Sequence, residues 1–403
     1  MDARGTAGRL LVGLTITSLL AACASSGAPT WTFAPVPPRT MEPEPMAAAA
    51  PESVVATCQP GSTPDKPGPV DQARPLGLSG MAGLSRMAFD RRAGRLVALA
   101  GTLDGPVETW TFDVCTNTWT RMNPNQPPTP GSRGLVYDVH SDLTIASDSA
   151  GMWAYDLEAN TWTERGLMAP PALAHPALAN LRFYHPGSGR IVDLGDDGDD
   201  DTLGLALWTY EVETDTWTPI QAESLAIGPH YEFFAYDASI DRLVAYANAW
   251  GPPDADGNRL FGARAWLLDF RTGSWSRTGT AAPGFSAGWW GHVPAMAYDE
   301  AAERTVILGQ GHSAAYDATA DHWETLYETP SRDQLPCTTR PECRQLQFMV
   351  YDPVNERLVV FGGFVLAAGS EVYPDDVLAF NTRTREWTVL LEASERLRGP
   401  SSE

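Results

Sequence analysis

The sequence has little positive charge and almost no lysine. Its 28 basic residues include a single lysine, Lys66, and they face 50 acidic residues, which gives a formal net charge of −22 at pH 7. Nucleic acids are bound mainly by Lys and Arg side chains on their phosphates, so this balance argues against a nucleic-acid partner. A soluble exported protein is often this acidic, and the charge alone therefore indicates no function.

The sequence also lacks a hydrophobic run long enough to cross a membrane. The apolar stretch at its amino terminus, Leu10–Leu20, is about half of the roughly 20 residues that a spanning helix needs. Arg4 and Arg9 precede this stretch, as in a secretory signal peptide. The stretch ends in Leu20-Ala21-Ala22-Cys23, which resembles the lipobox of bacterial lipoproteins. This resemblance implies that residues 1–22 are a signal peptide and that Cys23 carries a lipid.

Residues 23–80 contain little that could form a core. They are rich in Pro and Ala and include APVPPR and MEPEPMAAAAPE. Such a segment buries too little apolar surface to offset the entropy of ordering, so we expect a semi-extended tether. The protein should then be lipid-anchored in the cell envelope, outside the cytoplasmic membrane. Ala24 replaces the Asp that resembles a retention signal for the inner membrane, which favours the outer membrane where the cell has one. The alternative is an ordinary signal peptide with a chance Cys.

Cysteine is scarce, with five residues in the chain. Apart from Cys23, four remain, and an even number in an exported protein indicates two disulfides. Closeness in sequence favours Cys337 with Cys343, which leaves Cys58 with Cys115, although four cysteines allow three pairings. The Cys and His spacings do not indicate a zinc site.

A repeated pattern fills most of the remaining chain. Its first part is an aromatic residue followed by a polar one, in the pairs Phe89-Asp90, Tyr137-Asp138, Tyr184-His185, Tyr236-Asp237, Tyr298-Asp299 and Tyr351-Asp352. Five residues after the polar member, an apolar run opens at Arg95, Leu143, Arg190, Arg242, Arg304 and Arg357. Its second part is an acidic or amide residue six before a Trp, in the pairs Asp113/Trp119, Asp156/Trp162, Glu211/Trp217, Asp269/Trp275, Asp317/Trp323 and Asn381/Trp387.

Each copy predicts four short antiparallel strands, a to d, with tight a–b and c–d turns. The Gly, Pro and aromatic content agrees with short strands and many turns. A single sheet of this kind cannot bury both faces, so we expect six copies to stack radially as the blades of a closed ring. The fold class is therefore all-β, a six-bladed β-propeller over residues 81–393, followed by a tail at 394–403. The repeated Trp should pack one blade on the next.

The pattern resembles the kelch-repeat β-propeller, the fold of the central domain of galactose-oxidase-like proteins. Phe361-Gly362-Gly363 keeps the kelch diglycine, whereas Ala100-Gly101 and Leu194-Gly195 keep part of it. The resemblance implies the fold but leaves the activity open, because enzymes and binding proteins share this scaffold. Copper-radical oxidases of this class need a Cys–Tyr cross-link with further Tyr and His ligands. The sequence does not show that set, nor a Ser-His-Asp or phosphate-binding motif.

Residues that recur in every copy should serve the blade. We expect the repeated Asp to cap the a–b turn and the Arg five residues later to reach it across the hairpin. A binding site needs residues that do not recur, and the b–c and d–a loops vary most. The variable loops are 123–133, 168–180, 221–231, 247–264, 279–292 and 329–345.

These variable loops contain the candidate ligand-binding residues. His230 and His292 each precede the repeated Tyr by six, so they should be equivalent in blades 4 and 5, and His312 follows strand b of blade 5. The aromatic candidates are Tyr231, Trp250, Trp289 and Trp290. Together they suggest a pocket at the mouth of the channel for a sugar, a peptide or a metal. Alternatively, His230 and His292 only hydrogen-bond neighbouring loops.

Two acidic loops are candidate calcium sites, with Asp196, Asp197 and Asp199 in one and Asp254 and Asp256 in the other. Arg259 and Ala265 stand where a calcium loop needs Gly and Glu, so a solvated acidic loop is the alternative. No other cofactor is expected. The sequence thus predicts a monomeric, membrane-anchored binding protein for a protein or glycan. The alternative is a carbohydrate-active or oxidative enzyme with its site at the channel mouth.

Overall fold

The structure is a computed structural model of the chain. It describes residues 54–75, 87–101, 107–126, 128, 133–147, 151–165, 182–196, 205–220, 222, 232–253, 259–280, 295–309, 312–328, 344, 348–367 and 370–394. The predicted signal peptide, Cys23 and the first part of the tether lie outside these residues. Within the described part of the chain, no helix is long and apolar enough to cross a bilayer.

Six four-stranded antiparallel sheets make up the fold, and each consists of strands consecutive in one repeat. Blade 1 consists of β1 (Met87–Asp90), β2 (Arg95–Ala100), β3 (Glu108–Asp113) and β4 (Thr118–Arg121). Blade 2 consists of β5 (Arg133–Asp138), β6 (Leu143–Ser147), β7 (Met152–Asp156) and β8 (Thr161–Arg165). Blade 3 consists of β9 (Arg182–His185), β10 (Arg190–Asp196), β11 (Leu205–Glu211) and β12 (Thr216–Ile220). Blade 4 consists of β13 (Glu232–Asp237), β14 (Arg242–Pro253), β15 (Arg259–Asp269) and β16 (Ser274–Arg277). Blade 5 consists of β17 (Ala295–Asp299), β18 (Arg304–Gly309), β19 (His312–Asp317) and β20 (His322–Glu328). Blade 6 consists of β21 (Phe348–Asp352), β22 (Arg357–Phe361), β25 (Val377–Asn381) and β26 (Glu386–Leu391). A two-stranded hairpin, β23 (Val365–Ala367) with β24 (Ser370–Val372), is inserted between β22 and β25.

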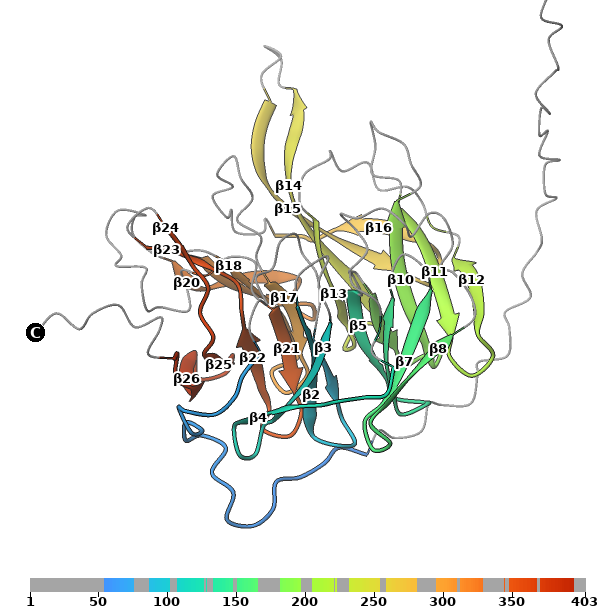
Figure 1. Ribbon diagram of the computed structural model, residues 1–403. Helices are drawn as coiled ribbons and strands as arrows, with labels where there is room; N and C mark the ends of the chain where they lie inside the picture. The colour runs from blue at the N-terminus through green and yellow to red at the C-terminus, as the bar shows by residue number, and fades with distance from the viewer. Residues whose placement is uncertain are drawn as a thin grey trace, which may run out of the picture. The chain divides into compact units, whose positions relative to one another are not determined.

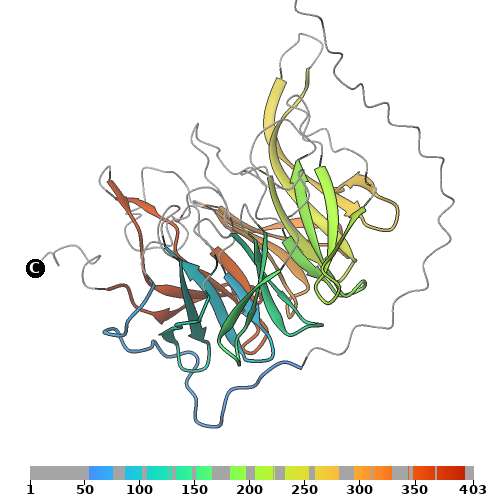
Figure 2. The ribbon, with the colours of Figure 1, turned by 45° about the vertical axis from the view of Figure 1, so that its right-hand side comes forward.

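The blades form a closed ring, which confirms the predicted six-bladed β-propeller. The first strand of each blade contacts the first strand of the next, through β1, β5, β9, β13, β17 and β21, and β21 returns to β1. Figures 1 and 2 show the blades fanned around these inner strands. No strand of one blade pairs into another among the described residues. Within this described part, the ring is therefore closed by packing between blades and not by a shared sheet.

Six apolar clusters fill the six seams between neighbouring blades, and each contains one repeated Trp. Trp119 of blade 1 packs with Phe361 of blade 6, their ring centroids 5.0 Å apart. Trp162, Trp217, Trp275, Trp323 and Trp387 likewise each join the cluster shared with the preceding blade. The predicted role of the Trp is confirmed, because the seams bury the sheet faces that a lone blade would expose to water.

The twelve tight turns share one backbone geometry. The residue just before strand b or strand d has a positive φ in every turn, and it is Gly94, Asn117, Asp142, Asn160, Gly189, Asp215, Asp241, Gly273, Glu303, Asp321, Glu356 or Arg385. Gly, Asn and Asp fill nine of these positions, as expected because they tolerate the left-handed region best. In five turns the Asp or Asn also accepts a hydrogen bond from the hydroxyl of a Tyr five residues earlier, on strand a or strand c.

The repeated Asp caps the a–b turn as expected. Asp90 accepts a hydrogen bond from the amide of Ala93, and Asp352 accepts two from Val354 and Asn355. The repeated Arg has a different partner from the one predicted. In blades 1, 3, 4 and 5 it pairs with the acidic residue of strand c, as Arg304 does with Asp317 at 2.7 Å.

Blade 6 alone shows the predicted pairing of the repeated Arg with the Asp of the a–b turn. Its strand c ends in Asn381, which carries no charge, and Arg357 contacts Asp352 at 3.2 Å instead. In blades 1, 4 and 5 the strand b Arg has one acidic neighbour in the a–b turn and another at the end of strand c, and the predicted pairing considered only the first. The choice of partner therefore follows the charge of strand c.

The segment 247–264, predicted as a variable loop, is mostly a β-ribbon. Strands β14 and β15 stay paired from Arg242 with Asp269 to Trp250 with Phe261, and again at Pro253 with Arg259. Figure 1 shows this ribbon projecting beyond its blade. The flanking strands continue their ladder into this stretch, where the paired residues Trp250 and Phe261 are of types that favour strands.

Candidate functional site

The predicted ligand-binding residues belong, by their sequence positions, to the b–c and d–a connections, and the end of the ring that carries these connections is here called the loop face. Trp250 is in the β14–β15 ribbon opposite Phe261, and His312 begins β19 opposite Gly309. For both residues the structure describes the backbone and not the side chain. His230, Tyr231, Trp289, Trp290 and His292 lie outside the described residues. The pocket that they would form remains a prediction.

The candidate calcium loops and the second disulfide also remain predictions. Asp196 ends β10 opposite Leu205, whereas Asp197, Asp199, Asp254, Asp256, Cys337 and Cys343 lie outside the described residues. Within the described part of the chain, no group of three or more His, Cys, Asp or Glu side chains could hold a metal ion. The predicted disulfide between Cys58 and Cys115 is confirmed.

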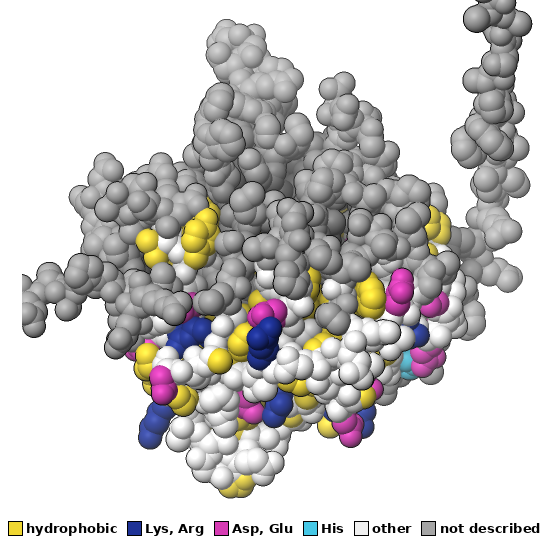
Figure 3. Space-filling view, viewed as in Figure 1, with side chains coloured by type: hydrophobic (Ala, Val, Ile, Leu, Met, Phe, Trp, Pro, Cys, Tyr) yellow, Lys and Arg dark blue, Asp and Glu magenta, His cyan; other side chains and the backbone are white. Residues whose placement is uncertain are grey.

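The opposite end of the ring, here called the turn face, is occupied by structural contacts. Arg91 in the a–b turn of blade 1 makes two hydrogen bonds, of 2.7 and 2.6 Å, to the carboxylate of Glu300 in the a–b turn of blade 5. These turns belong to blades that are not neighbours in the ring. Figure 3 shows acidic and basic side chains side by side over this part of the described surface. Charged side chains on the turn face are therefore engaged in ion pairs with one another and in turn caps.

Buried carboxylates line the turn face at the end of the inner strands. Asp90, Asp138, Asp237, Asp299 and Asp352 are all at most 4% exposed. Burial raises the pKa of Asp90 to about 6, against the opposing effect of its hydrogen bond from Ala93. Burial likewise raises the pKa values of Asp138, Asp237 and Asp352. These carboxyl groups cap turns although burial disfavours their charged form. Their role is therefore structural and not catalytic.

An Asp90→Asn variant should show this cost as a pH dependence. The folded protein binds the Asp90 proton more tightly than the unfolded chain does. The contribution of Asp90 to the unfolding free energy therefore falls as pH rises from about 4 to about 6. Asn stays neutral and can still accept from Ala93. The unfolding free energy of the variant relative to wild type should therefore increase by about 1–2 kcal/mol between pH 4 and pH 7, after solvent screening. Urea unfolding at both pH values measures it, and an equal difference at the two would contradict the assignment.

Blade 3 departs from the repeat at the turn face, where His185 replaces the capping Asp. Its Nδ1 lies 2.8 Å from Oγ of Ser188, and its Nε2 lies 2.7 Å from Oδ1 of Asp241 in blade 4. Asp241 also accepts from the hydroxyl of Tyr236 at 3.0 Å. The ring of Phe183 stacks on Tyr236 with centroids 5.0 Å apart. His185 thus joins blades 3 and 4 within an aromatic cluster.

The Ser188, His185 and Asp241 side chains have the composition of a nucleophilic triad, but their surroundings do not favour one. The nearest amides, those of Ser188 and Gly189, both donate to the carbonyl of His185 within the turn. They therefore cannot stabilise an oxyanion, which an acyl-transfer site requires. The arrangement is better explained as a turn cap that also bridges a seam. The sequence signal for it was the single His among five Asp at this position.

A second departure in blade 3 lies further toward the loop face. Arg182 on β9 and Asp193 on β10 are cross-strand partners and form an ion pair, with side chains 2% and 1% exposed. Arg182 also donates to the carbonyl of Gly134 in blade 2 at 3.2 Å. Burial raises the pKa of Asp193, and Arg182 opposes this shift. The pair is a buried ion pair that also reaches across the seam to blade 2.

The matching cross-strand pairs elsewhere are apolar. They are Met87 with Ala98, Phe234 with Ala245, Met296 with Ile307, and Met349 with Val360. Sequence reasoning missed this pair, although aligning the six repeats would have exposed an Arg and an Asp at two apolar positions. Among the described side chains, Nε of Arg182 has no hydrogen-bond partner. Blade 3 therefore differs most from the other blades in the polar side chains of its inner strands.

Comparisons with known proteins do not assign this chain to a family. A scan against protein-family models gives no match to this chain, and a search of the curated proteins finds no significant relative. The class that the structure itself defines is the six-bladed β-propeller with four-stranded antiparallel blades.

Proposed function

We propose that this chain is a kelch-type binding protein, anchored through a lipid on Cys23 and held outside the cytoplasmic membrane by its Pro-rich tether. In this proposal the propeller engages a protein or glycan through the loop face. The apolar signal segment, the Leu-Ala-Ala-Cys sequence and the composition of residues 23–80 support the anchoring. The kelch-like spacing of the repeats supports the family.

The observation that carries the binding role is the contrast between the two ends of the ring. On the turn face, the repeated polar side chains cap turns or pair between blades, and Arg91 with Glu300 links two blades that are not neighbours. Apart from His185 in blade 3, the polar residues of the a–b turns follow the repeat, whereas the connections on the loop face differ from blade to blade. The β14–β15 ribbon is an example, since it places Trp250 opposite Phe261 beyond the end of its blade.

The residue types predicted for the loop face suit a protein or glycan ligand. Tyr231, Trp250, Trp289 and Trp290 would supply rings with large contact area at low cost in side-chain entropy. His230, His292 and His312 would supply hydrogen bonds that fix the orientation of a ligand. Rigid scaffolds commonly carry such residues on loops.

Binding by the full chain in detergent can be measured on glycan and peptide arrays, followed by titration of the best ligand. Trp290→Ala with His292→Ala should weaken binding at least tenfold, as expected for central aromatic contacts. Glu213→Gln, in an exposed c–d turn on the turn face, is the control and should leave the affinity unchanged. The proposal fails if the loop-face variants bind normally while the turn-face variant does not.

A further inference from the structure

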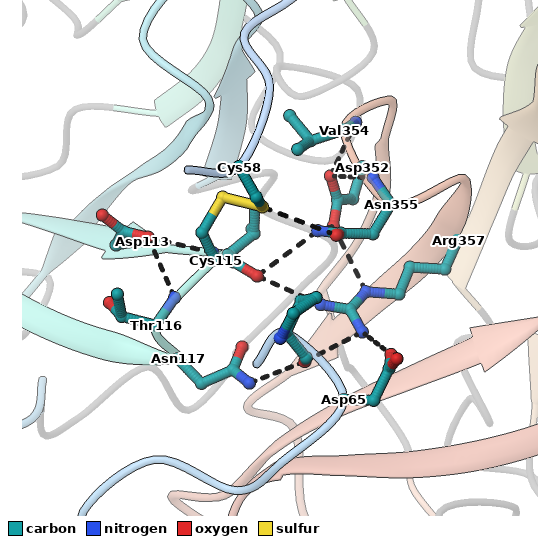
Figure 4. A network of polar contacts seen from close by, with 12 residues as sticks. Cys58, Asp65, Asp113, Cys115, Thr116, Asn117, Asp352, Val354, Asn355 and Arg357 are labelled. Atoms are coloured by element: carbon teal, nitrogen blue, oxygen red, sulfur yellow. Dashed lines mark hydrogen bonds and ion pairs between the residues drawn. A yellow bond between two sulfur atoms is a disulfide. The ribbon is translucent and has the colours of Figure 1, made fainter. Parts of the chain in front are cut away.

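The described part of the tether, residues 54–75, forms a strap across the seam between blade 6 and blade 1. At its amino-terminal end, Cys58 is bonded to Cys115 in the c–d turn of blade 1. The amide of Ala56 donates to the carbonyl of Arg91 in the a–b turn of the same blade. Sγ of Cys58 also lies 3.7 Å from Oδ1 of Asn355 in blade 6 (Figure 4). The strap therefore begins on the turn face with a covalent bond.

The middle of the strap contacts both blades. Asn117, in the c–d turn of blade 1, donates to the carbonyls of Pro64 and Lys66 at 2.8 Å. Arg357 of blade 6 donates to the carbonyl of Pro64 and to Asp65, both at 3.2 Å (Figure 4). The same guanidinium donates to the carbonyl of Val114 in blade 1 at 3.3 Å. One buried Arg thus ties together the strap and the two blades that close the ring.

Close packing continues where the strap passes the outer strands. The amide of Gly68 donates to the carbonyl of Leu390 on β26 at 2.8 Å. A Cβ on Gly68 would lie 2.0 Å from the carbonyl oxygen of Asn117, so only Gly fits there. The side chain of Gln72 accepts from the amide of Trp119 and donates to the carbonyl of Asn117. The backbone of the strap is thus fitted between the two blades.

The strap ends at the loop face. Arg74, with its side chain 5% exposed, contacts Oδ1 of Asp375 at 3.4 Å and donates to the carbonyl of Glu392 at 2.7 Å. Asp375 lies between β24 and β25, where the chain leaves the β23–β24 hairpin. At the base of this hairpin, Phe364, just before β23, packs against Tyr373, just after β24, with ring centroids 6.0 Å apart. A disulfide on the turn face and a hairpin on the loop face are therefore connected through one segment.

We propose that residues 54–75 are a redox-sensitive latch that closes the propeller and couples the state of the Cys58–Cys115 disulfide to the β23–β24 hairpin on the loop face. The described strands do not close the ring by pairing between blades, so the strap supplies the contacts that a shared strand would otherwise supply. This inference concerns the fold and does not depend on the identity of any ligand. Figures 1 and 2 show the strap running alongside blades 1 and 6 in both views.

The chemical step is thiol–disulfide exchange with a dithiol reductant. A thiolate of the dithiol attacks one sulfur of the pair, the bond between Cys58 and Cys115 breaks, and a mixed disulfide forms. The second thiol of the reductant then displaces the remaining cysteine. The protein gains two electrons and two protons as two thiols, and the reductant becomes a disulfide. Both cysteines are partly exposed, so a reductant can reach them.

Hydrogen exchange on the full chain, before and after adding dithiothreitol to the folded protein, tests the latch. Reduction should accelerate exchange roughly tenfold or more in Val365–Val372 and in β26, since local opening follows the loss of tertiary contacts. Strands β9 and β13, in the seam between blades 3 and 4, serve as the internal reference and should not change. Because the reductant acts on folded protein, the result does not depend on how any variant folds.

Two variants separate the latch from other causes. Cys58→Ser with Cys115→Ser should match the reduced wild type and should not respond to dithiothreitol, which excludes an effect through Cys337 and Cys343. Arg74→Leu should loosen the hairpin while the disulfide stays intact. If reduction accelerates exchange at Val114–Asn117 but leaves Val365–Val372 unchanged, the strap does not couple the two faces and the proposal is wrong.

Discussion

An Arg182→Met variant should lose about 3–5 kcal/mol of unfolding free energy, because it leaves the carboxylate of Asp193 buried without its cation. Asp193 is 1% exposed, and Arg182 is its charged partner in the structure. Burial already raises the pKa of Asp193 with Arg182 in place. Removing the guanidinium takes away the interaction that opposes this shift. Urea unfolding at pH 7 measures the loss directly.

The double variant Arg182→Met with Asp193→Ala should recover most of that stability. Blade 1 has this very pair, since Met87 lies opposite Ala98, so the substitution gives blade 3 a side-chain pair that the fold already accommodates. Replacing a buried ion pair by apolar residues is often neutral or stabilising. If the double variant is as unstable as Arg182→Met, the charge of Asp193 is not the cause of the loss. In that case the hydrogen bond from Arg182 to Gly134 would carry the effect.

The sequence was sufficient to predict the ring because the repeated residues have the same role in every blade. Trp119 and its five equivalents each fill one seam, and Asp90 and its equivalents each cap one turn. Each of these residues occupies the same place in its blade, so the spacing between them recurs in the sequence as a pattern. The positive-φ residue before each strand b and d follows the same rule. Its preference for Gly, Asn or Asp was visible in the sequence and would have located the turns more sharply.

The strap and the blade 3 ion pair were harder to predict because each occurs once. Arg74 contacts Asp375, about 300 positions away in the chain, and composition alone had assigned its segment to a semi-extended tether. The sequence indications that this segment docks were confined to its start, namely the short apolar run at Ser53–Cys58 and the pairing of Cys58 with Cys115. The β14–β15 ribbon was mistaken for a loop because Gly and Pro residues near its tip resemble turn signals.

The candidate ligand site could be placed only at the level of a face. Repeat topology assigns His230, Trp290 and His292 to the loop face, because the d–a connections lie there. It gives no side-chain positions, since loops that differ in every blade have no internal template. The site therefore rests on chemistry, namely rings and imidazoles in non-repeating positions, rather than on a measured geometry.

A Cys115→Ser variant should lose about 4 kcal/mol of unfolding free energy. The disulfide joins residues 57 positions apart, and a cross-link of that length restricts the unfolded chain by roughly this amount in the loop-entropy model. The comparison is oxidised wild type against variant in urea, with reduced wild type as the matched control. Reduced wild type and variant should unfold at the same urea concentration, and a variant as stable as the oxidised protein would contradict the prediction.

The same variant should also reveal whether the strap acts as a unit. Arg74→Leu alone should cost about 2–4 kcal/mol, because it leaves Asp375, which is 6% exposed, without its cation. In the Cys115→Ser background the strap has lost its covalent anchor, so its contacts at Asn117, Arg357 and Asp375 should form less often. The cost of Arg74→Leu should then shrink by at least about 1 kcal/mol, within the range of coupling seen for residues in one network. Simple additivity would mean that the strap's two ends are independent, and that the ring stays closed without the disulfide.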